Sequence, residues 1–319
     1  MKHLLATTTI LALSAGFAAA EVTLSGDARM GIISPFGGGD TAFTSRARVK
    51  FSMSGETDGG LAFGASFRAH NAGDAANGES GEVYISGAFG KLSMGDNDSA
   101  AQATVGQVDG VGLTGLGDLN EIAYIGDGSP SALYTHAVGG MSFALSLGQL
   151  DNGNDEMSVA AAYSMDGYKF SIGYEEGFSV VETGLAFGIV PWDTFNMTSQ
   201  VTLGADATFG AITVKARYAT ADGTEAVWND ATTRDQIALS ATYTMDALSL
   251  TAFVAQSDLS GDPSEGEETD RYGIGASYDL GGGASVVGGY SSIDGTTCDG
   301  FFCDSWSDSA FDLGLSFSF

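Results

Sequence analysis

The last ten residues of the chain read Ala310-Phe311-Asp312-Leu313-Gly314-Leu315-Ser316-Phe317-Ser318-Phe319. From Phe311 onward every odd position holds a large apolar residue, and every even position holds a small or polar one. This period of two predicts a β-strand with one apolar and one polar face, because successive side chains of a strand point to opposite sides. An apolar strand that ends the chain on Phe is typical of the closing strand of a transmembrane β-barrel, whose outer face meets lipid.

The same alternation recurs along the whole chain, in sixteen segments. They lie near residues 22–32, 47–53, 61–67, 82–87, 91–96, 131–138, 140–149, 156–165, 168–175, 199–208, 211–219, 235–245, 248–256, 271–280, 284–290 and 310–319. Short turns rich in Gly and Asp alternate with longer polar loops at 34–42, 71–81, 97–130, 150–155, 176–198, 220–234, 257–270 and 291–309. An even strand number and this alternation of connections predict an all-β fold, a transmembrane 16-stranded antiparallel β-barrel.

The width of such a barrel decides which face points outward. Sixteen strands enclose a space too wide for side chains to fill, so the apolar faces are expected to meet lipid and the polar faces to line water. Six aromatic residues beside short turns are expected to form a belt at one membrane interface. They are Tyr163, Tyr168, Phe209, Tyr243, Tyr278 and Phe319. The sequence therefore indicates a pore.

The start of the chain predicts export to the outer membrane. A basic start, an apolar run from Leu4 to Phe17 and an A-x-A site at Ala18–Ala20 predict a signal peptide over residues 1–20. Residues 21–319 are then expected to form a single transmembrane β-barrel domain. With 12 basic residues against 40 acidic ones, the net charge is −28. Nucleic acid is therefore not an expected partner, because phosphate binding needs a basic face.

The few basic residues are concentrated near the N-terminus. Of the eleven that follow the predicted signal peptide, five lie before residue 71, on the polar faces of three predicted strands. Together with a histidine they form the predicted basic wall, which consists of Arg29, Arg46, Arg48, Lys50, Arg68 and His70. Antiparallel pairing is expected to place Arg29 opposite Arg46 or Arg48, and one of those two opposite Arg68, about 5 Å apart. Like charges this close repel by about 1 kcal/mol even in water, so carboxylates are expected nearby.

The longest connection, 97–130, is the expected source of those carboxylates. Its 34 residues exceed an ordinary hairpin loop, which predicts a packed role of its own. Our hypothesis is that this third loop folds into the barrel, faces the basic wall and forms a pore constriction. The candidate carboxylates are those of Asp98, Asp109, Asp118, Glu121 and Asp127. The alternative is a loop that projects outside the barrel and leaves the arginines solvated.

The only two cysteines of the chain, Cys298 and Cys303, are separated by four residues in a segment rich in Gly, Asp and Ser. Exported proteins reside in an oxidising compartment, so a local disulfide is the leading hypothesis. Two ligands without a neighbouring histidine do not favour a zinc site.

Three stretches also carry a resemblance to a known family. Residues 83–96, Val-Tyr-Ile-Ser-Gly-Ala-Phe-Gly-Lys-Leu-Ser-Met-Gly-Asp, resemble the strand-turn-strand before the constriction loop of general bacterial porins. Residues 21–31 and 273–285 are similar to the alphaproteobacterial, phototroph-type branch of these Gram-negative proteins. The similarity extends from Glu21 to Phe319 and is weakest over 176–198 and 291–309.

The resemblance implies a homotrimer of barrels, each with a water-filled channel for ions and small hydrophilic solutes. It also implies an inward third loop, with Arg29, Arg46, Arg48 and Arg68 matching the wall. Asp109, Asp118 and Glu121 match the loop. No cofactor is required, although loop carboxylates of the family can bind calcium. Outer-membrane lipid and lipopolysaccharide are the implied surroundings, and the α-amine of Glu21 is implied to contact the Phe319 carboxylate.

Two rival functions are weaker. An outer-membrane hydrolase needs a nucleophile and a base within hydrogen-bond reach. Beyond the predicted signal peptide the chain has only His70 and His136, on separate predicted strands and outside any recognisable catalytic pattern. A substrate-specific sugar channel would need a stripe of aromatic residues along the polar faces, and the alternation places none there.

Overall fold

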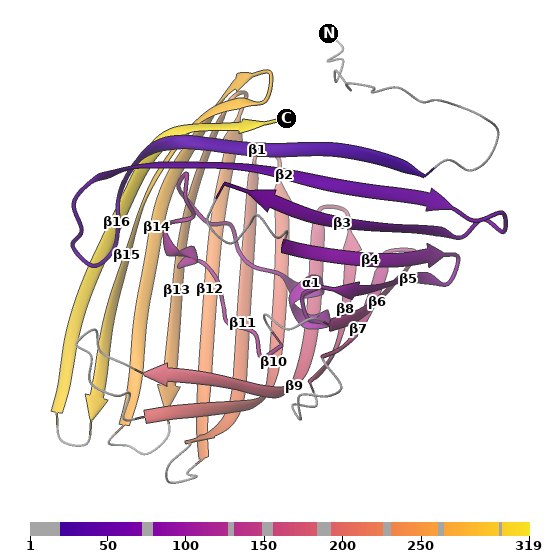
Figure 1. The fold of residues 1–319 in the computed structure, drawn as a ribbon. Helices are drawn as coiled ribbons and strands as arrows, with labels where there is room; N and C mark the ends of the chain where they lie inside the picture. The colour runs from indigo at the N-terminus through magenta and orange to yellow at the C-terminus, as the bar shows by residue number, and fades with distance from the viewer. Residues whose placement is uncertain are drawn as a thin grey trace.

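The computed structural model describes residues 20–71, 79–126, 131–148, 156–183, 193–225, 231–260, 265–299 and 302–319. Almost all of the predicted signal peptide, and Asp127, lie outside the described residues. Sixteen antiparallel strands form a closed barrel in sequence order, with β16 paired to β1 (Figure 1). The strands are β1 (Glu21–Ser34), β2 (Ala42–Glu56), β3 (Ala62–His70), β4 (Glu79–Gly87), β5 (Gly90–Gly95), β6 (Ser131–Val138), β7 (Met141–Leu147), β8 (Met157–Met165), β9 (Tyr168–Thr183), β10 (Asp193–Phe209), β11 (Ile212–Glu225), β12 (Ala231–Met245), β13 (Leu248–Ser260), β14 (Glu265–Gly281), β15 (Ala284–Asp299) and β16 (Phe302–Ser318). None of the helices in these ranges is both long and apolar enough to cross a membrane.

The predicted fold class is confirmed, but several predicted long loops are wrong. The segments 176–198, 257–270 and 291–309 consist mostly of strand, because β9, β10 and β13–β16 extend past the alternating stretches. The outward face of these extensions carries polar residues, as Asp258 and Asp294 illustrate. Beyond the lipid both faces of a strand contact water, so the hydrogen-bond ladder continues while the alternation disappears.

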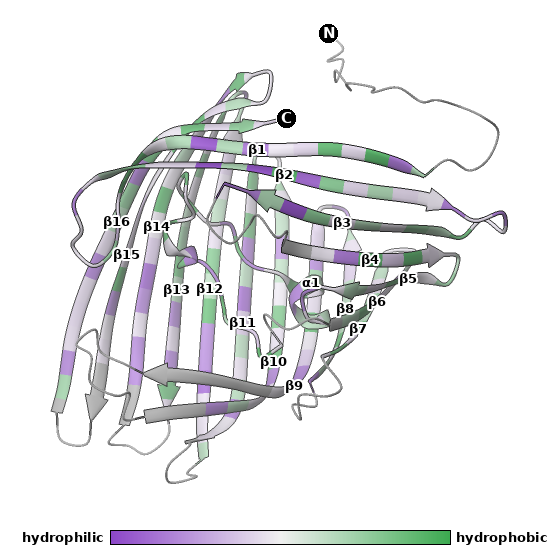
Figure 2. Ribbon diagram, viewed as in Figure 1, coloured by the Kyte–Doolittle hydropathy of each residue, from purple (hydrophilic) through white to green (hydrophobic). Residues whose placement is uncertain are grey.

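The barrel places its apolar side chains on the outside, as predicted. On β7 the side chains of Met141, Phe143 and Leu145 are exposed, whereas those of Ala144 and Ser146 are buried. All six aromatic residues of the predicted belt are exposed as well. Figure 2 shows the resulting alternation of apolar and polar residues along the strands. This pattern is that of a transmembrane barrel, in which the outer face forms an apolar band.

The short turns carry the backbone conformations that close two-residue hairpins. Asp166 and Gly167, between β8 and β9, have φ values of 45° and 86°. Asp246, between β12 and β13, has a φ of 51°. Positive φ values at the centre of a turn match the right-handed twist of the flanking strands.

The two ends of the described barrel meet on neighbouring strands. Phe319 donates its main-chain N–H to the carbonyl oxygen of Gly26 at 2.9 Å, and Gly26 donates back at 3.3 Å. The implied contact of Phe319 with Glu21 is therefore wrong, because the register places Glu21 opposite Ser54 of β2. The closing strand pairs with residues 27–34 of β1, and residues 21–25 extend beyond its end.

The connection between β5 and β6 lies inside the ring of strands (Figure 1). Its described part, residues 96–126, is called the inner loop below and contains the helix α1 (Ala100–Val105) and the 3-10 turn η2 (Leu116–Asp118). Each of the four buried apolar clusters in the described chain joins residues of the inner loop to residues of the barrel wall. The dry interior of this protein therefore lies between the inner loop and the wall.

Candidate functional site

Helix α1 fixes the start of the inner loop against β7 and β8. The hydroxyl of Ser99 caps the helix by accepting the main-chain N–H of Gln102 at 3.1 Å. The next two free N–H groups, of Ala100 and Ala101, donate at 2.9 Å to the hydroxyls of Ser146 and Ser158. The wall therefore satisfies backbone donors that a helix N-terminus leaves without partners.

Two cations of the wall bind carbonyl groups at the end of α1 and just after it. Arg217 of β11 donates from Nε to the carbonyl oxygen of Gly106 at 2.9 Å and from Nη2 to that of Gln107 at 3.2 Å. Its Nη1 pairs with Asp206 at 2.5 Å. Lys169 of β9 donates to the carbonyl oxygen of Thr104 at 2.6 Å. Charge-assisted hydrogen bonds of this kind are about twice as strong as neutral ones.

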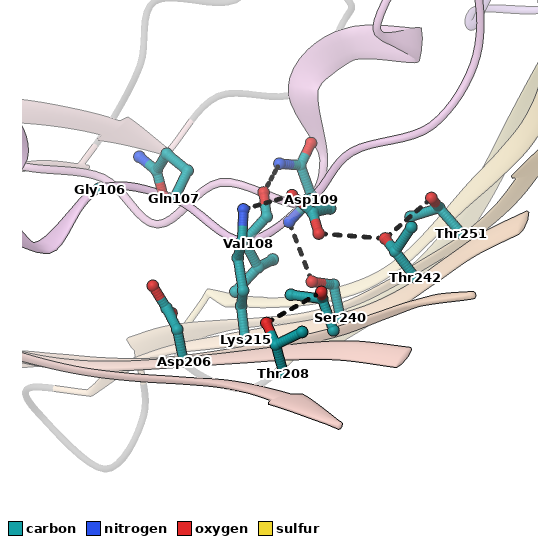
Figure 3. Close-up of polar contacts among 12 residues, drawn as sticks. Gly106, Gln107, Val108, Asp109, Asp206, Thr208, Lys215, Ser240, Thr242 and Thr251 are labelled. Carbon is teal, nitrogen blue, oxygen red and sulfur yellow. Dashed lines mark hydrogen bonds and ion pairs between the residues drawn. The ribbon is translucent and has the colours of Figure 1, made fainter. Parts of the chain in front are cut away.

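Asp109 lies at the centre of the next contact (Figure 3). Its carboxylate pairs with Lys215 of β11 and accepts the hydroxyl of Thr242 at 3.1 Å. Its main-chain N–H donates to the hydroxyl of Ser240 at 3.0 Å. Sequence reasoning placed Asp109 opposite the basic wall, and this partner assignment is wrong. The carboxylate instead anchors the inner loop to β11 and β12.

Further along, Asp312 of the closing strand binds the inner loop. Its carboxylate accepts the main-chain N–H groups of Leu113 and Thr114 at 2.8 and 2.6 Å. Arg29 of β1 donates to the carbonyl oxygen of Leu113 at 3.2 Å. Asp312 is buried. It belongs to the polar face of the closing strand. The alternation of polar and apolar residues predicts that face, but it does not predict that Asp312 is buried and accepts hydrogen bonds from the inner loop.

A row of glycines on the wall lets the inner loop approach closely. A Cβ atom at Gly173 of β9 would lie 2.5 Å from the Cβ atom of Ala101. Similar contacts under 3.0 Å join Gly204 to Val105, Gly275 to Val111, Gly289 to Gly112 and Gly314 to Leu113. The row crosses β9, β10 and β14–β16 in the order of the loop residues. A glycine within a strand often marks such a close approach of another backbone.

The basic wall is assembled on β1–β3 nearly as predicted. Arg29 lies directly opposite Arg46, and Asp27 lies opposite Arg48. Asp27 accepts from Arg48 Nε at 2.8 Å and pairs with Arg46 at 3.4 Å. This carboxylate was missed, although it precedes Arg29 on the same face. It shows that part of the neutralising charge comes from the wall itself.

Pairing of the basic residues of β2 and β3 differs from the prediction by two positions. Lys50, rather than Arg46 or Arg48, lies opposite Arg68, and Arg48 lies opposite His70. The cause is the turn at 57–61, in which Thr57 donates its N–H to Leu61 and accepts that of Gly60. A shift by two residues keeps every side chain on the same face.

The remaining basic residues also lie on the lumen side, a regularity not predicted from the sequence. Lys91 lines a cavity together with residues of α1, and Arg271 donates to the carbonyl oxygen of Glu121 at 3.0 Å. Among the described residues every Lys and Arg is thus on the polar face of its strand. A cation placed at the lipid midplane would cost about 2–4 kcal/mol.

Two of the other predicted acidic residues of the loop lie in one region. Asp118 and Glu121 are exposed and line a cavity of about 450 Å³ with Arg234 and Arg271. They therefore lie beside basic residues of β12 and β14, which sequence reasoning did not consider. Among the described residues no group of three or more His, Cys, Asp or Glu side chains is arranged to hold a metal ion.

The two cysteines lie at the end of the β15–β16 hairpin. The register places Cys298 directly opposite Cys303. Cys303 is disulfide-bonded. Cross-strand neighbours at the tip of a hairpin are close enough for such a bond.

Comparison with known proteins identifies the family. A family model described as Gram-negative porin matches residues 6–297. The chain belongs to the Gram-negative porin family. A porin from Rhodobacter capsulatus is 39% identical to it over 326 positions, which cover 94% of this chain and all of that protein. A solved porin structure matches with a TM-score of 0.75 at 36% identity, over 94% of this chain and 100% of the other.

A more distant structure shares the fold alone. The trimer form of OmpT, an outer membrane protein of Vibrio cholerae, matches with a TM-score of 0.78 at 15% identity, covering 94% of this chain and all of that one. Family membership and the closed barrel together show that this porin is an outer-membrane protein whose lumen is a water-filled diffusion channel. The resemblance found in the sequence is confirmed.

Proposed function

We propose that ions and small hydrophilic solutes cross this porin through a constriction between the basic wall and the inner loop. The observation that carries the proposal is the hydrogen bond from Arg29 to the carbonyl oxygen of Leu113. The inner loop contacts β7–β12, β14 and β16, and it reaches β1 at this point. The part of the lumen that the inner loop leaves open therefore lies beside β1–β6, which include the basic wall.

The charge of the wall sets the expected ion preference. Asp27 contacts both Arg46 and Arg48, so one carboxylate faces two guanidinium groups and the wall keeps a positive excess. The chain as a whole is strongly acidic, with a net charge of −28. Cations are attracted by the protein and opposed at the wall, which predicts a weak cation preference.

Planar-bilayer recordings of the Arg46→Gln/Arg48→Gln double variant test the proposal. Removing two positive charges should shift the reversal potential across a salt gradient toward stronger cation selectivity and change the single-channel conductance. The Arg46→Lys/Arg48→Lys variant keeps the charge and serves as the control. Unchanged values in the first variant, or an anion-selective native channel, would contradict the proposal.

The same protein is proposed to work as a homotrimer without catalysis. Support comes from the family and from the trimer form of the related fold. Native mass spectrometry in detergent should give three times the mass of one chain, and a monomer mass would contradict it. An ester-hydrolysis assay is expected to give no turnover, since His70 and His136 lie on different strands, β3 and β6.

Processing and surroundings complete the proposal. A signal peptide of residues 1–20 is proposed to be removed before Glu21, and a Cys298–Cys303 disulfide to close the outer hairpin. Intact mass of the exported protein tests both, since reduction and alkylation must add two adducts.

The exposed apolar band is proposed to contact outer-membrane lipid and lipopolysaccharide. Lipopolysaccharide co-purification that survives a detergent wash would support this contact, and its absence would count against it.

A further inference from the structure

A cavity of about 450 Å³ lies between the inner loop and the wall of β12–β15, on the side away from the basic wall. Its loop side is formed by residues 117–123, and its wall side includes Arg234 of β12 and Arg271 of β14. Gln236 and Thr269 add uncharged polar groups. This volume lies within the usual range for small-molecule sites.

Arg234 is buried in this cavity without full compensation. Only 6% of the residue is exposed. Its Nη2 donates to Oε1 of Gln200 at 3.1 Å, whereas its Nε has no acceptor among the described residues. The carboxylate of Glu175 attracts Arg234 through space, but it accepts the main-chain N–H of Ile125. A buried guanidinium with an unpaired donor is costly unless an acceptor reaches it.

Arg271, also on the wall side of the cavity, likewise has buried donors without acceptors. Its Nη1 donates to the main-chain oxygen of Glu121, while Nε and Nη2 are buried and lack acceptors among the described residues. Neither Arg234 nor Arg271 forms an ion pair within the part of the chain that the structure describes. The two arginines thus have three buried nitrogen atoms without a hydrogen-bond acceptor among the described residues. An anionic ligand group such as a carboxylate could accept hydrogen bonds from them.

The cavity also contains acidic side chains. Asp118 and Glu121 are exposed at its loop side, and Glu267 is partly buried at its wall side. An anion alone would be repelled by these groups. A molecule that carries a carboxylate and an ammonium group matches both signs of charge.

We propose that this cavity is a solute-binding site of the channel that takes small zwitterions of the amino-acid type. The two arginines bind the solute carboxylate, and the acidic side chains bind its ammonium group. The site shares the inner loop with the proposed constriction but uses no residue of the basic wall, so Arg234 and Arg271 variants test it separately from Arg46 and Arg48 variants.

Saturation-transfer NMR on the purified full-length porin in detergent micelles tests the site with three probes of similar size. L-Alanine carries both charged groups, propionate only the carboxylate, and ethylammonium only the cation. Alanine is expected to give the strongest signal. Arg234→Gln or Arg271→Gln should weaken alanine binding about tenfold, because each removes hydrogen bonds to a charged group. Lys91→Gln removes a lumen charge from a separate cavity on β5 and should leave binding unchanged.

Arg234→Lys guards against a folding defect, since it keeps the charge but removes the Nε donor. This variant should run as a folded barrel on unheated SDS gels and still bind alanine more weakly than the native protein. Native-like binding in folded Arg234→Gln and Arg271→Gln would overturn the site. Equal signals from propionate and alanine would overturn the role given to the acidic side chains.

Discussion

Asp312 Oδ1 accepts the main-chain N–H of Leu113 at 2.8 Å, which joins the closing strand to the inner loop across 199 residues of sequence. The other oxygen, Oδ2, accepts the N–H and the hydroxyl of Thr114 at 2.6 and 2.7 Å. Since β16 also pairs with β1, whose Arg29 contacts Leu113, closure of the barrel and docking of the loop share one site. Conduction and stability of this porin are therefore expected to depend on the same carboxylate.

Replacing Asp312 by Ala should release this part of the inner loop. Three hydrogen bonds to a charged acceptor are lost, and two main-chain donors are left buried, which should cost about 3 kcal/mol of folding free energy. We expect larger and noisier single-channel currents and an earlier urea transition. Ser316→Ala, on the same face of β16, is the control. Native-like noise in Asp312→Ala would show that the loop stays docked without this contact.

The glycine row should be intolerant of even one methyl group. In Gly173→Ala the new Cβ would meet Ala101 at 2.5 Å, so α1 must move or the barrel must strain. A cost of about 1–3 kcal/mol is typical of such overpacking. Thermal unfolding in detergent measures it, together with the conductance. Gly59→Ala, in a turn where the nearest atom is 3.9 Å away, should be neutral. Equal stabilities of the two variants would contradict a close-packed loop.

Asp109 and Lys215 should be energetically coupled. A double-mutant cycle with Asp109→Asn and Lys215→Gln isolates their interaction from the effect of each change alone. Both side chains are 29% exposed, so a coupling of about 1 kcal/mol is expected rather than the larger value of a fully buried pair. Urea unfolding of the four proteins gives the value. Additive changes would mean that Thr242 and Ser240 hold Asp109 without the ion pair.

Ionisation of Tyr124 is expected to destabilise the docked inner loop at alkaline pH. Burial raises the pKa of its phenol above the usual value of 10.0, and the hydroxyl donates to the carbonyl oxygen of Gly106 at 2.9 Å. A raised pKa means that the neutral phenol stabilises the folded state fully below pH 10 and that this contribution is lost as the pH rises beyond it. Absorbance at 295 nm should show a late phase of tyrosine ionisation that is smaller by one tyrosine in Tyr124→Phe. A late phase of equal amplitude in both proteins would contradict the burial of Tyr124.

The sequence by itself determined the barrel. Alternation in segments such as 310–319 fixed the strand number, the outward apolar face and the positions of the short turns, because a strand at a lipid–water boundary has no other way to place its side chains. It also limited the partner of Arg29 to Arg46 or Arg48, since pairing across one turn is a local matter, and the register selects Arg46. A local Cys298–Cys303 disulfide was predicted from the short spacing, but the pairing of the two cysteines across β15 and β16 was not, because 291–309 was predicted to be a loop.

Only the tertiary structure decided how the lumen is divided. Asp312 and the glycine row are ordinary polar-face residues in the sequence, and their roles appear only where the inner loop crosses strands far away in the chain. The partner of Asp109 was missed for this reason, because Lys215 is 106 residues away. Contacts within a strand pair follow from spacing along the chain. Contacts between a loop and the wall depend on how the closed ring positions all sixteen strands at once.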